Sequence, residues 1–166
     1  MYDIDIVLLL SRWIHISAAI VAIGGAAYQR FALLPGTGEA LDDAARDRLG
    51  ESVRRRWSKV VAGSIGVLLL TGFLNFALVA VPPKVYAIPY HPVFGVKLLA
   101  ALTIFFLASV LAGRSPGFAA MRKNGAKWLS VILGLGVLIV LLSGLLSQIR
   151  QHQPPPPPVV TSTEGP

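Results

Sequence analysis

The chain has 166 residues, of which 54% are hydrophobic and only 14% are charged, and its mean hydropathy is +0.67. Soluble domains carry about 25% charged residues, so this composition excludes an ordinary soluble domain and indicates a membrane protein. The sequence contains no cysteine. Disulfides, thiolate metal ligands and c-type haem attachment are therefore excluded.

Four apolar runs are long enough to cross a membrane as α-helices. They cover residues 6–28, 60–81, 93–111 and 128–148. A hydrocarbon core of about 30 Å needs about 20 such residues. We therefore predict an all-α integral membrane protein with one four-helix bundle over residues 1–150. The first run follows Asp3 and Asp5 and is too long for a signal peptide, so we expect it to remain as a helix.

The connections between these runs differ in character. The first, which includes residues 36–59, predicts a short surface helix that begins near Glu39 and leads into the second span. The second, residues 82–92, is rich in proline and aromatic residues and places His91 just before the third span. After the fourth span, residues 151–166 begin with a proline-rich stretch, which predicts a disordered tail of polyproline II character.

The net charge of +7 is unevenly distributed. Eleven of the 15 basic residues lie in residues 30–59 and 114–127, whereas the 82–92 connection has only Lys84. Because basic loops stay on the cytoplasmic side, we predict an up-down-up-down bundle with both termini on the outer side. The basic charge then orients the protein and contacts anionic lipid headgroups, and we expect no nucleic-acid binding.

Polar and ionisable side chains inside a membrane span cost free energy, so their presence indicates a functional or structural role. With a helical rise of about 1.5 Å per residue, His15 lies roughly 13 Å below the outer surface, Lys97 roughly 6 Å, Thr71 roughly 15 Å and Asn75 roughly 9 Å. Together with Arg12, these residues predict a cationic, hydrogen-bonding site in the outer half of the bundle. Such a site suits an anionic or metal-containing ligand.

Each of these residues also has a purely structural interpretation. Arg12 and Lys97 can extend to the outer headgroups, and Thr71 and Asn75 can join helices by hydrogen bonds. His15 is too deep and too short to reach the headgroups. It can serve as an axial haem ligand, with Arg12 or Lys97 near the propionates, as a proton relay, or as a structural hydrogen-bonding group. A copper site at His15 and His91 lacks the soft ligands that Cu(I) prefers.

Three stretches resemble the superfamily of CopD-like membrane proteins and HemJ-type protoporphyrinogen oxidases. They are RWIHISAAIVAIGG in the first span, RRRWSKVVAGSIGVLLLTGFLNF at the second and GVKLLAALTIFFLA in the third. The resemblance covers about residues 8 to 148. It equates the first-span histidine with His15, the third-span lysine with Lys97, and the threonine-glycine pair with Thr71 and Gly72.

The resemblance implies a four-helix membrane domain, expected in the bacterial inner membrane. Its HemJ branch implies haem b, oxidation of protoporphyrinogen, and catalytic roles for His15 and Lys97, whereas its CopD branch implies copper uptake or resistance. The chain departs from the HemJ pattern because LASVLAGR at the end of the third span has no histidine. We therefore expect a haem-b-binding, redox-linked protein. Two alternatives remain: an accessory protein for transport of copper or another small solute, and a structural subunit of a larger membrane complex or homo-oligomer.

Overall fold

The computed structural model describes the backbone of residues 6–80 and 90–151 and the side chains of residues 6–77 and 92–148. The helical elements are α1 (Ile6–Tyr28), the π-helical η1 (Gln29–Leu33), α2 (Leu34–Ala40), α3 (Asp43–Ala80), α4 (Tyr90–Ala112), the 3-10 turn η2 (Pro116–Phe118), α5 (Ala119–Lys123) and α6 (Gly125–Gln151). No strand occurs in these two ranges, which confirms the all-α prediction for them. The predicted tail from residue 152 lies outside the described residues.

Four helical runs are long and apolar enough to cross a membrane. They are Ile6–Ala40, Asp43–Ala77, Pro92–Ala112 and Gly125–Gln148. Many large apolar side chains on them point away from the bundle, such as Leu70, which is 73% exposed, and Val140, which is 69% exposed. A surface of this kind is unfavourable in water and is the ordinary outer face of a bundle in lipid. The chain is therefore an integral membrane protein.

The second apolar run belongs to a helix much longer than a membrane span. With 38 residues, α3 is about 57 Å long, nearly twice the hydrocarbon thickness. The surface helix that the sequence predicts from Glu39 begins instead at Asp43 and continues into the span without a break. Its start is fixed by Asp42, whose carboxylate accepts a hydrogen bond of 2.7 Å from the Ala45 N–H. This is a typical helix N-cap.

The first apolar run also continues beyond its predicted end. After α1, the π-helical η1 contains a bond from the Leu34 N–H to the Gln29 carbonyl, and α2 follows directly. Pro35 explains the wider turn, because it has no N–H to donate and its ring crowds the preceding turn. The helix ends at Ala40, and the following residue, Leu41, is extended with φ −125° and ψ 143°.

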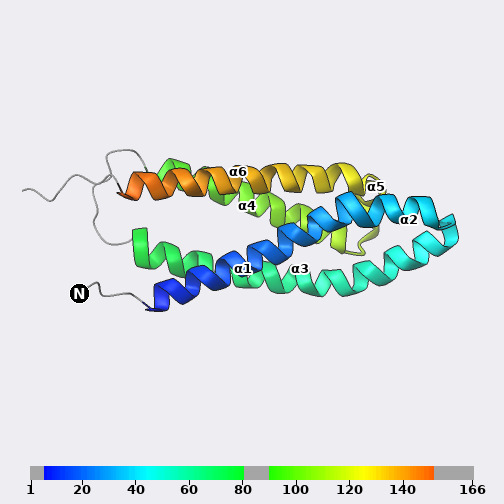
Figure 1. Ribbon diagram of the computed structural model, residues 1–166, viewed down its shortest axis with the longest axis horizontal. Coiled ribbons are helices and arrows are strands. Elements are labelled where there is room, and N and C mark those ends of the chain that lie inside the picture. Colours follow the sequence, from blue (N-terminus) through cyan, green and yellow to red (C-terminus); the bar gives the residue numbers. More distant parts are fainter. Residues whose placement is uncertain (1–5, 81–89, 152–166) are drawn as a thin grey trace, which may run out of the picture.

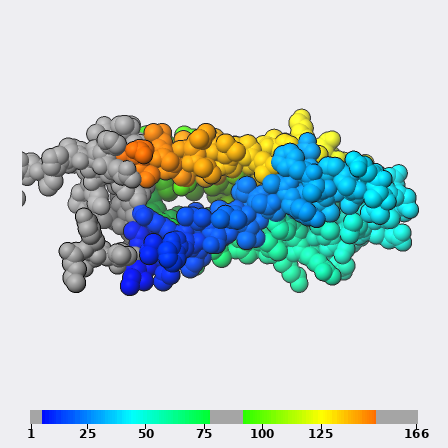
Figure 2. All heavy atoms as spheres, in the orientation of Figure 1, coloured from blue at the N-terminus to red at the C-terminus, as the bar shows by residue number. Residues whose placement is uncertain are grey.

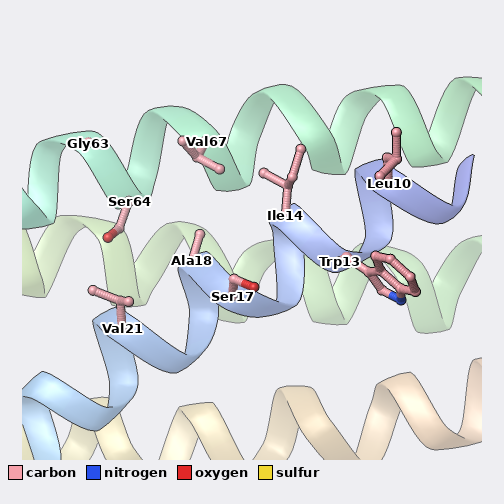
Figure 3. Close-up of a pocket in the computed structure, with 9 residues that line it drawn as sticks. All are labelled: Leu10, Trp13, Ile14, Ser17, Ala18, Val21, Gly63, Ser64 and Val67. Atoms are coloured by element: carbon pink, nitrogen blue, oxygen red, sulfur yellow. The ribbon is translucent and has the colours of Figure 1, made fainter. Parts of the chain in front are cut away.

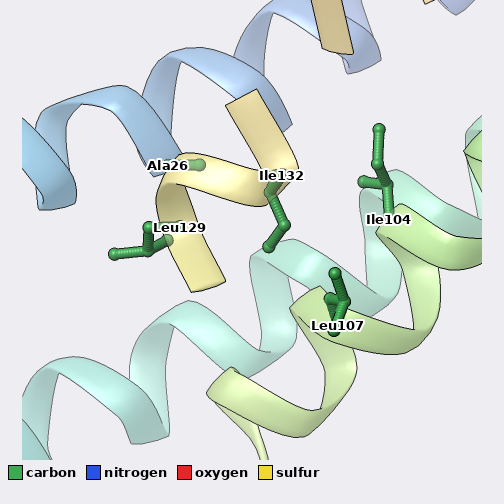
Figure 4. Close-up of a cluster of buried hydrophobic side chains, with 5 residues drawn as sticks. All are labelled: Ala26, Ile104, Leu107, Leu129 and Ile132. Carbon is green, nitrogen blue, oxygen red and sulfur yellow. The ribbon is translucent and has the colours of Figure 1, made fainter. Parts of the chain in front are cut away.

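The long helices pack as two main pairs, α1 with α3 and α4 with α6 (Figure 1). The pairs also meet through α3 with α4 and through α1 with α6. A buried cluster contains residues of α1, α4 and α6, which are Ala26, Ile104, Leu107, Leu129 and Ile132 (Figure 4). We call the part of the bundle around these five residues the packed half.

Two glycines permit close helix contacts in the packed half. A Cβ atom added at Gly25 of α1 would overlap the indole ring of Trp57 on α3. A Cβ atom at Gly136 of α6 would lie 3.1 Å from Cδ1 of Ile23 on α1. Small residues allow helix backbones to approach closely in lipid, where packing replaces the hydrophobic effect. These two positions therefore set how closely α1 approaches its neighbours.

The opposite part of the bundle is more open. Figure 1 shows the start of α1 and the end of α6 at one end of the molecule, with α2 and α5 at the other. Figure 2 shows α1 and α6 diverging toward the end where α1 begins, which leaves a hollow between them. We call this part the polar half, defined by Ser11, His15, Thr71, Asn75 and Lys97.

Candidate functional site

The polar half is assembled from three helices. Ser11 and His15 lie four residues apart on α1, Thr71 and Asn75 lie four apart on α3, and Lys97 lies near the start of α4. Residues four apart share one face of a helix, so α1 and α3 each present a short polar row. Ser11 is only 4% exposed and Thr71 only 6%, which shows that these rows face the interior.

The central contact joins His15 to Thr71. His15 Nδ1 lies 2.8 Å from Thr71 Oγ1. The same hydroxyl donates to the Val67 carbonyl at 2.6 Å, and a hydroxyl has only one hydrogen to donate. Nδ1 must therefore carry a proton and donate to Thr71. In the neutral imidazole this leaves the lone pair on Nε2.

The His15 ring lies against the backbone of α3. A Cβ atom added at Gly72 would be 3.5 Å from His15 Cε1, an ordinary van der Waals distance. The ring is half-buried and is held by a hydrogen bond at Nδ1. Together these contacts fix both the position and the tautomer of the imidazole.

Lys97 brings a positive charge to the same place. It is half-buried on α4 and close enough to His15 to interact with it electrostatically. On the same helix, the ring of Phe94 stacks with that of Phe76, with centroids 4.5 Å apart, and links α4 to α3. The two residues that the resemblance equates with catalytic positions thus lie together in the structure.

Two polar atoms of the polar half are buried without a hydrogen-bond partner among the described residues. They are Ser11 Oγ and Asn75 Oδ1. An unsatisfied buried polar group costs about 1 to 3 kcal/mol, and such groups often mark a site completed by a ligand or an ordered water. Sequence reasoning missed Ser11. Its spacing of four residues from His15 is the signal that could have found it.

The other predicted site residues are placed differently. Arg12 is exposed on α1, three residues before His15. His91 is the second residue of α4 by backbone, but its side chain lies outside the described residues. Ser143 on α6 donates to the Ile139 carbonyl of its own helix at 2.6 Å.

A separate apolar groove of about 500 Å³ follows the contact between α1 and α3 (Figure 3). Its lining includes Trp13, Ser17 and Ala18 of α1 and Gly63 and Ser64 of α3. Trp13 is 58% exposed. His15 does not line this groove, so the groove is distinct from the polar half.

Among the side chains described, no group of three or more His, Cys, Asp or Glu residues is arranged to hold a metal ion. The chemistry of the polar half is instead that of one imidazole, one ammonium group, two hydroxyls and one amide. One imidazole with a fixed tautomer can ligate a metal that brings its other ligands with it, as haem iron does.

No protein-family model matches the chain, and no curated protein or solved structure matches it.

Proposed function

We propose that the protein binds haem b in the polar half and acts as a redox-linked membrane protein similar to the CopD and HemJ superfamily. The observation that supports this most is the hydrogen bond from His15 Nδ1 to Thr71 Oγ1. Histidines that ligate metals almost always donate their second ring N–H to an oxygen, which orients the ring. His15 is oriented in this way, with Nε2 as the ligating atom.

The residues present fit this group. His15 Nε2 would hold the iron, and the cationic side chains of Lys97 and Arg12 would pair with the propionates. Asn75 Oδ1 and Ser11 Oγ are buried without partners among the described residues; a bound group or an ordered water would donate to the amide oxygen and pair with the hydroxyl. Haem b supplies a one-electron redox couple when it is bound.

The chain's own residues then have distinct tasks. Thr71 holds the His15 tautomer, and Lys97 places a positive charge that favours the reduced state of the site. The resemblance to the HemJ branch makes a porphyrinogen the substrate class to assay first, with His15 and Lys97 as the catalytic residues.

An absorption spectrum of the purified protein, first oxidised and then reduced with dithionite, tests this function. We expect a Soret band that shifts on reduction in the natural protein and is lost in His15→Ala. Ser143→Ala is the matched control, because Ser143 bonds within its own helix. A folded natural protein with no Soret band after expression with added haem would refute the proposal.

We further propose that the four spans alternate in direction, with both termini on the outer side of a bacterial inner membrane. The basic residues support this orientation, because eleven of 15 lie in residues 30–59 and 114–127. The chain has no cysteine, so each introduced cysteine is a unique label. We expect Ser115→Cys to react with a membrane-impermeant maleimide only after lysis, and Ser162→Cys to react in intact spheroplasts. The reverse pattern would refute the orientation.

A structural subunit is the second candidate, and the groove between α1 and α3 favours it. Its small lining residues Ala18 and Gly63 leave room for a further transmembrane helix, such as one from a second copy. Ala18→Leu would then abolish the oligomer while leaving the Soret band intact. The copper alternative depends on His91, whose side chain lies outside the described residues.

A further inference from the structure

We propose that a pocket at the basic end of the bundle binds a phosphate group through Arg54 and Arg122. The pocket has a volume of about 150 Å³ and is lined by residues of η1, α2, α3, α4 and α6, with Arg122 from α5. A cavity needs roughly 10 to 15 Å³ to hold one water molecule, so this pocket has room for a larger ligand. The site is separate from the polar half and does not depend on haem.

The charge of the pocket is strongly positive. Arg46, Arg54 and Arg122 line it, and none of its lining residues is acidic. Arg46 already has an ion pair with Asp43, whose carboxylate is 91% exposed. Arg46 is therefore partly neutralised at the rim, whereas Arg54 and Arg122 are available to a ligand inside.

Arg122 carries the most specific evidence. Its Nη1 atom is buried and has no hydrogen-bond partner among the described residues. Leaving a charged donor buried and unsatisfied is costly. Guanidinium groups present paired N–H donors that match phosphate oxygens. An anion in this pocket would satisfy the atom that the protein itself leaves without a partner.

The position of the pocket relative to the apolar part of α3 indicates which class of ligand it binds. Arg54 lies six residues before Val60, where the apolar part of α3 begins, which is about 9 Å along the helix. The headgroup layer on each side of a bilayer is about 5 to 8 Å thick, so the Arg54 backbone lies at its aqueous edge and the long side chain extends to the level of the phosphates. Leu33, Leu49 and Leu129 also line the pocket, so apolar and cationic surfaces meet there. This combination suits a phosphate group at headgroup level, from an anionic lipid or from a free phosphate ion.

Native mass spectrometry of the full chain in detergent tests this site with dioctanoyl phosphatidylglycerol as the probe. We expect saturable binding of one lipid, and at least a tenfold weaker affinity in Arg122→Gln. Arg114→Gln is the matched control, because Arg114 is exposed and does not line the pocket. Dioctanoylglycerol, which has no phosphate, should not bind in its place.

The source of the phosphate is identified by adding inorganic phosphate as a competitor. Displacement of the lipid by millimolar phosphate means that the free ion is also a ligand, and no displacement means that the lipid is the ligand. Both results support a phosphate site. Equal weakening in Arg122→Gln and Arg114→Gln, or equal binding of dioctanoylglycerol, overturns it.

A second pair of variants guards against misfolding of Arg122→Gln. Arg54 lines the pocket and is half-buried, whereas Arg56 on the same helix is exposed. We expect Arg54→Gln to weaken lipid binding by about tenfold and Arg56→Gln to leave it unchanged. The same affinity in both variants overturns the proposal even if Arg122→Gln does not fold.

Discussion

The packed half and the polar half are built from the same helices and differ in what they bury. In the packed half, Ile132 is 2% exposed and Leu107 is 4% exposed, and both belong to the apolar core cluster. In the polar half the most buried described residues of α1 and α3 include Ser11 and Thr71. Buried oxygens without partners occur there at Ser11 and Asn75.

The difference shows that the apolar core cluster needs no further partner, whereas the buried polar atoms of the polar half do. Apolar packing between helices needs no further partner, since its contacts are satisfied within the protein. Buried polar atoms and a hollow between α1 and α6 are costly unless something fills them. Stability should therefore depend mainly on the packed half, and haem binding mainly on the polar half.

The largest effect on stability is expected from Ile132→Ala. Removing a core side chain in soluble proteins costs about 2 to 5 kcal/mol, and the lost packing contacts apply in lipid as well. Val131→Ala is the control, because Val131 is 37% exposed. Unfolding in mixed micelles by sodium dodecyl sulfate should show the difference, with the haem content per folded molecule unchanged in both. A loss of haem without a loss of stability would contradict the division into two halves.

A slightly smaller loss of stability is expected from Gly25→Ala. The new Cβ atom would overlap the Trp57 ring, and overpacking costs about 1 to 3 kcal/mol. At the neighbouring Gly24, a Cβ atom meets nothing within 4 Å, so Gly24→Ala should be neutral or slightly stabilising. The same unfolding measurement compares the two. Equal stabilities would mean that α1 does not approach α3 as closely as described.

In the polar half, Thr71→Val should weaken haem binding by about 10- to 100-fold, as outer-shell changes at metal sites do. Valine keeps the shape of threonine but cannot accept the His15 Nδ1–H. Thr71→Ser keeps the hydroxyl and should retain near-natural affinity. Haem titration followed at the Soret band measures both. If the two variants bind haem equally, the Thr71 hydroxyl does not orient His15.

The smallest effect is expected from Lys97→Gln. Removing a positive charge close to His15 should lower the midpoint potential of bound haem by tens of millivolts, or on the order of 1 kcal/mol. Lys97→Arg keeps the charge and should change the potential less. Redox titration gives both values. An unchanged potential in Lys97→Gln would place its charge too far from the iron to matter.

The sequence predicts the membrane class, and it singles out His15 and Thr71, which the structure brings into contact. Hydropathy depends only on composition along the chain, so the four apolar runs are visible without a structure. The depths of His15 and Thr71 follow from the helical rise. Their 2.8 Å contact cannot be derived from the helical rise, because it depends on how α1 and α3 are rotated about their axes.

Other features depend on three-dimensional packing and were not predictable. The continuation of the first helix through η1 to Ala40 arises from a local change in hydrogen bonding near Pro35. The pocket that we propose for phosphate joins Arg54 and Arg122, which are far apart in the chain. From the sequence alone, these arginines indicate only the orientation of the protein in the membrane. Which residues of one segment face those of another depends on the packing of the helices.

The central claim is that Nε2 of His15 ligates haem iron, and ligand replacement in a glycine variant tests it most directly. His15→Gly, purified without imidazole, should lack the Soret band of the natural protein. Adding imidazole, which can occupy the vacated space, should restore haem binding and a spectrum close to the natural one. Full haem content in His15→Gly without imidazole would contradict the account.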